Sequence, residues 1–150
     1  MSTPHTANVY IKNLTGGRAV ITMCHQYSDH AVESGTWTVE FGDTAGPLTV
    51  NFETGFLTGL DYWYCSAAVM DGPNPGIYVT EGSAAAPEKE CELESKDANS
   101  TFTNTVDAQT FHMNQPSGGC TTSMSRTGPY SPITNVFLLM LENHSFDHIF

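Results

Sequence analysis

Runs in which apolar and polar residues alternate recur between residues 8 and 113. In residues 36–41, Trp37, Val39 and Phe41 occupy every second position, and residues 48–52 repeat this pattern. Because successive side chains point to opposite faces of a strand, such a run predicts a β-strand with one buried face. The other runs of this kind lie at residues 8–13, 18–27, 60–70, 77–80, 88–94, 100–105 and 110–113.

Clusters of Gly, Pro, Asn and Asp separate these runs, and the densest is residues 71–76, with the sequence DGPNPG. No segment before residue 132 has the spacing of apolar positions that is typical of an amphipathic helix. Many short strands between turn signals indicate a sandwich or a barrel. We predict an all-β fold, an antiparallel β-sandwich of about eight strands over residues 1–115, followed by a C-terminal loop and an apolar tail.

The composition changes in residues 116–132, which hold four Ser, three Thr, three Gly and three Pro. Such a segment has few side chains to bury, which favours a linker between two folded parts. The alternative is a long surface loop that folds against the sandwich. The sequence does not separate these two interpretations.

An apolar run from Val136 to Leu141 follows, and Glu142 and Asn143 come directly after it. A continuous apolar run is typical of a strand that is buried on both faces, as in parallel sheets. Ligands of open α/β sheets gather beyond the carboxyl ends of the strands. A carboxylate and an amide at that point predict metal ligands.

Residues 142–148, ENHSFDH, resemble the first motif of the phosphoesterase family that includes bacterial phospholipase C and certain acid phosphatases. The family motif has Arg where this chain has His144. The resemblance implies that residues 133–150 are the truncated start of a phosphoesterase domain. It also implies that Glu142 and Asn143 are vestigial metal ligands. We expect no cofactor, since a divalent metal would be bound only in a full-length relative.

The preceding residues resemble a β-domain that stands in front of fungal phosphoesterase-like proteins. They also resemble a nematode stress-associated domain that is up-regulated in long-lived insulin-receptor mutants. The segments that carry this resemblance are residues 25–29, 46–50, 55–63, 89–93 and 111–114. The resemblance implies a modular order, with the β-domain followed by a phosphoesterase.

The net charge of the chain limits the kinds of molecule that it can bind. The chain has 16 acidic residues against five Lys and Arg, a formal net charge of −11. Such a chain repels phosphate groups, so we expect no nucleic-acid binding and no strong binding to anionic membranes. Neutral glycans and basic proteins remain compatible partners. Because no secretory signal precedes the first strand, we expect a cytoplasmic protein or one exported without a standard signal.

Asp61, Tyr62 and Trp63 form the centre of the most aromatic run. An aromatic ring can stack on the C–H face of a sugar while a carboxylate accepts its hydroxyl hydrogen bonds. Since Asp61 and Trp63 share one face of the strand, they are a candidate carbohydrate site, with Tyr62 beside them. The alternative places Trp63 in the core and the flanking tyrosines, Tyr62 and Tyr64, outside.

His25, Tyr27 and Asp29 also share a strand face, so they are candidate ligand-binding residues in a polar pocket or a cation site. The alternative is a solvated strand end with a turn at Ser28 and Asp29. The sequence has no G-x-S-x-G nucleophile motif. We therefore expect no enzymatic activity from this chain.

The four cysteines have wide spacings, without a CxxC pair, which argues against a structural zinc site. Cys24 and Cys65 lie within apolar runs and are interpreted as small buried residues. Cys91 and Cys120 flank the last strand-like segments and can pair. The sequence alone does not decide whether Cys91 and Cys120 form a disulfide.

The function that these patterns favour is non-catalytic recognition, most specifically of carbohydrate in a lectin-like manner, by a module associated with a phosphoesterase-type protein. One alternative is a truncated phospholipase C-like phosphoesterase whose catalytic domain is missing. Another is a structural or defence protein that forms homo-oligomers through the apolar tail at residues 133–150.

Overall fold

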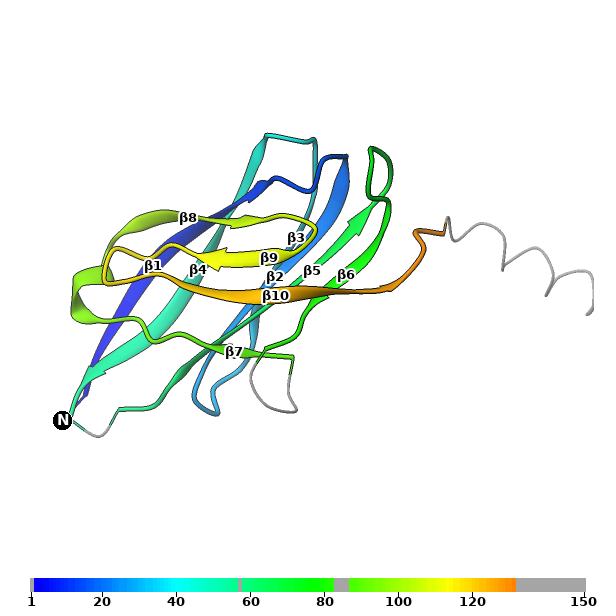
Figure 1. Cartoon of the computed structure of the whole chain (residues 1–150). Helices are drawn as coiled ribbons and strands as arrows, with labels where there is room; N and C mark the ends of the chain where they lie inside the picture. The colour runs from blue at the N-terminus through cyan, green and yellow to red at the C-terminus, as the bar shows by residue number, and fades with distance from the viewer. Residues whose placement is uncertain (1, 57, 83–86, 132–150) are drawn as a thin grey trace, which may run out of the picture.

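The fold is almost entirely β-structure in the computed structural model, which describes residues 2–56, 58–82 and 87–131 (Figure 1). The strands are β1 (Ser2–Asn13), β2 (Ala19–Tyr27), β3 (Glu33–Val39), β4 (Thr44–Gly55), β5 (Asp61–Val69), β6 (Gly76–Thr80), β7 (Lys89–Glu90), β8 (Thr101–Val106), β9 (Thr110–Met113) and β10 (Cys120–Gly128). A single 3-10 turn, η1 (Ser95–Asp97), precedes β8 in the described chain. The predicted all-β class is confirmed.

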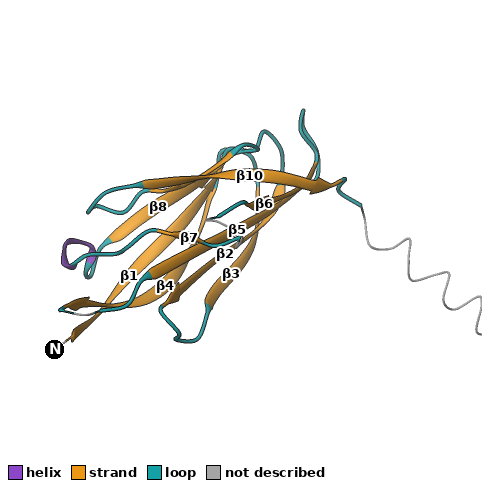
Figure 2. Cartoon of the chain, turned by 60° about the horizontal axis from the view of Figure 1, so that its bottom comes forward, coloured by secondary structure: helices purple, strands orange, loops and turns teal. Residues whose placement is uncertain are grey.

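The strands form one sheet with the order β3-β2-β5-β6-β10-β9-β8-β1-β4, and the short β7 pairs with β5. β10 joins the two halves of this sheet. Its residues 120–123 pair with β9 and its residues 124–128 pair with β6. The sheet curls around the core until it is nearly closed into a barrel, with β3 and β4 at its two ends (Figures 1 and 2).

Two details differ from the predicted antiparallel sandwich of about eight strands. The described chain has ten strands, and β1 pairs with β8 in parallel over residues 8–13 and 101–106. The segment predicted as a linker or a long loop instead contributes β10. In β10, Thr122 and Met124 point inward and are buried, so the alternation was present there but carried by few apolar residues.

The core lies between the two halves of the curled sheet. Every second residue of β2 and β5 is buried, which matches the alternation of a strand with one inward face. Trp63, Phe52 and Phe111 are the largest of the fully buried side chains. Burial of one such side chain contributes about 1.5–3 kcal/mol to stability. The outward-facing side chains of β2 and β5 are not part of this core.

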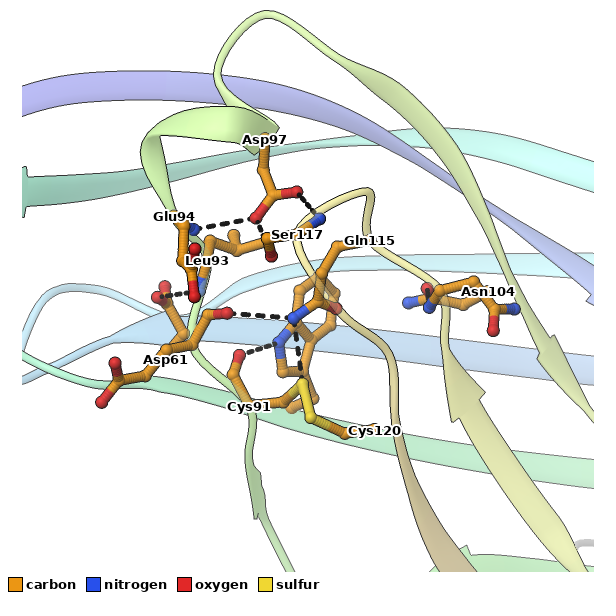
Figure 3. The surroundings of a disulfide bond; sticks show 12 residues. Asp61, Cys91, Leu93, Glu94, Asp97, Asn104, Gln115, Ser117 and Cys120 are labelled. Carbon is orange, nitrogen blue, oxygen red and sulfur yellow. Dashed lines mark hydrogen bonds between the residues drawn. A yellow bond between two sulfur atoms is a disulfide. The ribbon is translucent and has the colours of Figure 1, made fainter.

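Cys91 and Cys120, whose pairing the sequence left open, form a disulfide that ties the segment after β7 to the start of β10 (Figure 3). The bond closes a sequence separation of 29 residues. Such a cross-link stabilises a fold by about 3–4 kcal/mol in the chain-entropy description. The carbonyl of Cys91 also accepts a hydrogen bond from the Trp63 indole, 3.1 Å away. This segment is thus held firmly beside the core.

Candidate functional site

A pocket of about 350 Å³ lies on the outer face of β2 and β5. Small-molecule sites typically occupy about 300–1,000 Å³, so this pocket has room for a small ligand or one part of a larger one. The residues that line it are Cys24, His25, Gln26, Val32, Tyr62, Trp63, Tyr64, Pro87 and Glu88.

Strand register builds the floor of this pocket. Cys24 on β2 lies directly opposite Tyr64 on β5, and Gln26 lies opposite Tyr62. All four residues occupy the outward, half-buried positions of their strands. Two aromatic rings, an amide and a thiol are therefore presented together at the surface.

The rim of the pocket comes from two neighbouring segments. β7 pairs with β5 beside the tyrosines, and the chain just before β7 places Glu88 at the pocket. Pro87 is fixed there because its carbonyl accepts a hydrogen bond from Thr80 at 2.7 Å. On the opposite side, the Gln26 amide donates to the carbonyl of His30, which anchors the turn that presents Val32.

Burial favours the neutral forms of two groups of the floor, the Cys24 thiol and the Tyr64 hydroxyl. Burial raises the pKa of the Cys24 thiol. Burial also raises the pKa of the Tyr64 hydroxyl, and the negative charge of Glu88 adds to this effect. Near neutral pH the pocket thus offers a thiol, hydroxyls and an amide beside one carboxylate. Such a set can form hydrogen bonds and stack on a ligand, but it contains no activated thiolate.

Beneath the pocket, on the inner face of the same strands, lies a buried charged network. The His25 ring is wholly buried, with Nε2 2.7 Å from Asp61 Oδ1 and Nδ1 2.9 Å from Glu33 Oε2. The other oxygen of Asp61 accepts the backbone N–H of Leu93 at 2.8 Å. The ring also packs against Trp63, with centroids 4.7 Å apart.

The two carboxylates favour the protonated form of His25. Burial alone would lower the pKa of His25, but its hydrogen bonds to Asp61 and Glu33 outweigh burial, so the pKa is raised. An imidazolium donates from both ring nitrogens, which is what two flanking carboxylates require. A histidine with both nitrogens engaged in this way cannot accept a proton from a substrate.

Glu33 extends the network across the gap between the two end strands of the sheet. Its carboxylate, on β3, accepts hydrogen bonds from the backbone N–H and the side-chain amide of Asn51 on β4. Burial would raise the pKa of Glu33, but the bonds from His25 and Asn51 prevail and lower it. The network therefore links β2, β3, β4 and β5, and its role is structural.

The expected sugar-binding pair, Asp61 and Trp63, is wrong as a surface site. Both side chains face the interior, with 1% and 0% exposure, because the odd positions of β5 point inward. The alternative, with Trp63 in the core, is the one observed. Tyr62 and Trp63 both line the pocket, but only Tyr62 presents a half-buried side chain on the outer face.

The three residues predicted to share a polar pocket are also separated. His25 is buried in the network described above. Tyr27 is buried, and its hydroxyl oxygen accepts the backbone N–H of Gly59 at 2.6 Å. Asp29 is exposed on the turn after β2. Strand alternation did place His25 and Tyr27 on one face, but that face is the inner one.

The sequence interpretation missed Cys24, Gln26, Val32, Pro87 and Glu88 as pocket residues. The sequence carried a signal for the two tyrosines of the floor, because placing Trp63 inside puts Tyr62 and Tyr64 outside. Gln26 and Cys24 then follow only from the register between β2 and β5, which local patterns do not reveal.

Glu142 and Asn143, the predicted metal ligands, lie outside the described residues. Within the ranges that the structure covers, no group of three or more His, Cys, Asp and Glu residues could hold a metal ion. The covered part of the chain also has no helix that is long and apolar enough to cross a membrane. The phosphoesterase resemblance of residues 133–150 stays a prediction.

Two comparisons with known proteins differ in their result. A search of curated proteins finds no match to this chain. A family model described as "Up-Regulated in long-lived daf-2" matches residues 3–81. That range runs from β1 through β6 and includes the charged network and the pocket floor. The chain therefore belongs to this family, as the resemblance to the nematode domain predicted.

Proposed function

We propose that this domain is a non-catalytic recognition module that binds carbohydrate, in a lectin-like manner, in the pocket over β2 and β5. The observation that carries the proposal is the arrangement of Tyr62 and Tyr64 beside the Gln26 amide and the Glu88 carboxylate. Aromatic rings can cover the apolar C–H face of a sugar. Amide and carboxylate groups can bind its hydroxyls.

The chemistry of the pocket supports binding without catalysis. The raised pKa of Cys24 keeps its thiol protonated, and a thiol is a poor nucleophile compared with a thiolate. His25, the histidine among the lining residues, has both ring nitrogens bonded, one to Asp61 and one to Glu33. A general base needs a free acceptor atom within reach of the substrate, and this histidine has none.

A glycan array with the purified protein tests the proposal. We expect saturable binding to a defined group of neutral or cationic sugars. Tyr64→Ala should weaken that binding about tenfold or more, since it removes one stacking ring. Tyr10→Ala is the matched control, because Tyr10 is a half-buried tyrosine on β1 outside the pocket.

Two results would overturn the proposal. One is an array on which the folded wild-type protein binds no glycan. The other is binding that Tyr64→Ala and Tyr10→Ala weaken equally, which would place the contact elsewhere. Circular dichroism of both variants confirms that each remains folded before binding is compared.

A further inference from the structure

The charges around the pocket narrow the class of sugar. Glu88 lines the pocket, and none of the nine lining residues is Lys or Arg. Glu90 pairs with Tyr62 across β5 and β7 and is exposed. Because alternate positions share a face, Glu88 and Glu90 lie on the tyrosine side, and Lys89 between them points to the other side.

The buried network beneath the floor adds to this negative field. It sets two carboxylates, Asp61 and Glu33, against the single imidazolium of His25. Its net charge is therefore negative, and the whole chain carries −11. Uronic acids, sialic acids and phosphorylated sugars would be repelled from this pocket.

We propose that the pocket selects sugars that carry a free, protonated amine, such as the glucosamine units of chitosan. The inference rests on the proposed carbohydrate function and deepens it. In this geometry the ammonium group pairs with Glu88 at the rim, while the ring of the sugar covers Tyr62 and Tyr64. An ammonium group is also attracted to the faces of aromatic rings, so one substituent satisfies both features of the pocket.

Acetylation of the amine separates this inference from general sugar binding. An N-acetyl group leaves the ring of the sugar unchanged but removes the positive charge. Chitosan and chitin oligomers of equal length are therefore a matched pair of probes. Only the first should benefit from Glu88, whereas both should benefit from Tyr64.

Isothermal titration of the protein with both oligomers tests the inference, in a mildly acidic buffer where the amines are protonated. We expect chitosan oligomers to bind roughly tenfold more tightly, the ratio expected when an exposed ion pair and a cation–π contact are lost together. Glu88→Gln should reduce that preference, because it removes the ion pair but leaves the aromatic rings in place, and it should leave chitin binding unchanged. Glu92→Gln is the control, since Glu92 is exposed and lies outside this pocket.

Cys24 supplies a readout that reports on the pocket itself. It is a half-exposed free cysteine on the floor, whereas the other free cysteine, Cys65, is fully buried. Chitosan oligomers should slow the alkylation of Cys24 by iodoacetamide, and chitin oligomers at the same concentration should slow it less. Mass spectrometry of the modified peptide identifies which cysteine has reacted.

Three outcomes would overturn the inference. Equal affinity for the two oligomers, or tighter binding of chitin, would refute amine selection while leaving carbohydrate binding in place. A preference that Glu92→Gln reduces as much as Glu88→Gln would assign it to the charge of the whole protein. Binding of neither oligomer, together with an array on which no glycan binds, would refute both this inference and the proposed function.

Discussion

The two faces of β2 and β5 contrast sharply, although they are built from the same two strands. On the inner face, His25 and Asp61 are buried, and each of their side-chain polar atoms has a hydrogen-bond partner. On the outer face, Tyr62 and Tyr64 line an open pocket beside Gln26. A saturated polar cluster stabilises the fold, whereas accessible groups around a hollow are available to a ligand.

This contrast explains why residue type alone led to side chains that are buried in the core. The inner cluster contains a histidine, a tryptophan and carboxylates, which are the residue types most often found in functional sites. Buried charges are nonetheless retained in many folds when they are paired, and here the pairing is complete. Substitutions on the inner face should therefore reduce stability, and those on the outer face should reduce binding.

The largest expected effect belongs to Asp61→Ala. The substitution removes one of the two carboxylate partners of His25 and leaves the N–H of Leu93 without the carboxylate to which it donates. Removing one member of a buried ion pair costs about 3–5 kcal/mol. Urea unfolding should show this loss. The exposed Asp29→Ala should stay within about 0.5 kcal/mol of the wild type. A loss below about 1 kcal/mol for Asp61→Ala would contradict the structural role of the network.

The second-largest expected effect is on the pH dependence of the free energy of unfolding. His25→Gln should reduce that dependence, because it removes the imidazole that titrates. The pKa of His25 is raised in the folded state, so its contribution is complete below its ordinary pKa of 6.5 and is lost as the pH rises through the raised value. The pKa of Glu33 is lowered, so its contribution is complete above 4.5 and is lost as the pH falls through the lowered value. The network is thus strongest between these two ordinary values.

Unfolding of the wild type and of His25→Gln at a series of pH values checks this window. The difference between them should be largest inside it and should shrink by about 1–3 kcal/mol at high pH, the usual contribution of charge-assisted hydrogen bonds. A difference that does not vary with pH would show that His25 stabilises the fold without its charge.

Tyr64→Ala should have the opposite profile to Asp61→Ala. Its side chain is half-buried on the outer face, so we expect a stability loss of about 1 kcal/mol or less. The same variant should lose glycan binding about tenfold. Parallel measurement of unfolding and binding separates the two faces. A large stability loss without loss of binding would remove the contrast between them.

The smallest effect is expected for Cys24→Ser. The side chain is half-buried on the outer face, so the substitution does not place a hydroxyl in the core. Stability should change by about 0.5 kcal/mol or less. Cys65→Ser should cost more, because it places a hydroxyl in the core. Similar effects at both positions would contradict the assignment of Cys24 to the outer face.

Local patterns predicted the fold class and most strands, since alternation and turn residues are local signals. They did not predict β10, because Thr and Ser carry its alternation and resemble loop residues by composition. They also could not reveal the network, in which His25 and Asp61 are 36 positions apart in the sequence. Such contacts depend on strand register, which is set by the whole sheet.

The same limit applies to the pocket. Tyr62, a candidate from the sequence, does line the pocket, but Gln26 comes from the neighbouring strand and Glu88 from beyond β6. Only the folded sheet brings these three segments together. The pairing of Cys91 with Cys120, which spacing left open, likewise depends on the fold, which brings the segment after β7 beside the start of β10.

The most direct test of the account is an NMR titration of the protein with the tightest-binding glycan from the array. The account predicts that the largest amide shifts fall at Cys24, Gln26, Tyr62, Tyr64 and Glu88. It also predicts small shifts for the acidic hollow lined by Glu53, Glu92 and Glu94. Largest shifts at that hollow, or no shifts at saturating glycan, would contradict the claim that the outer face of β2 and β5 is the binding site.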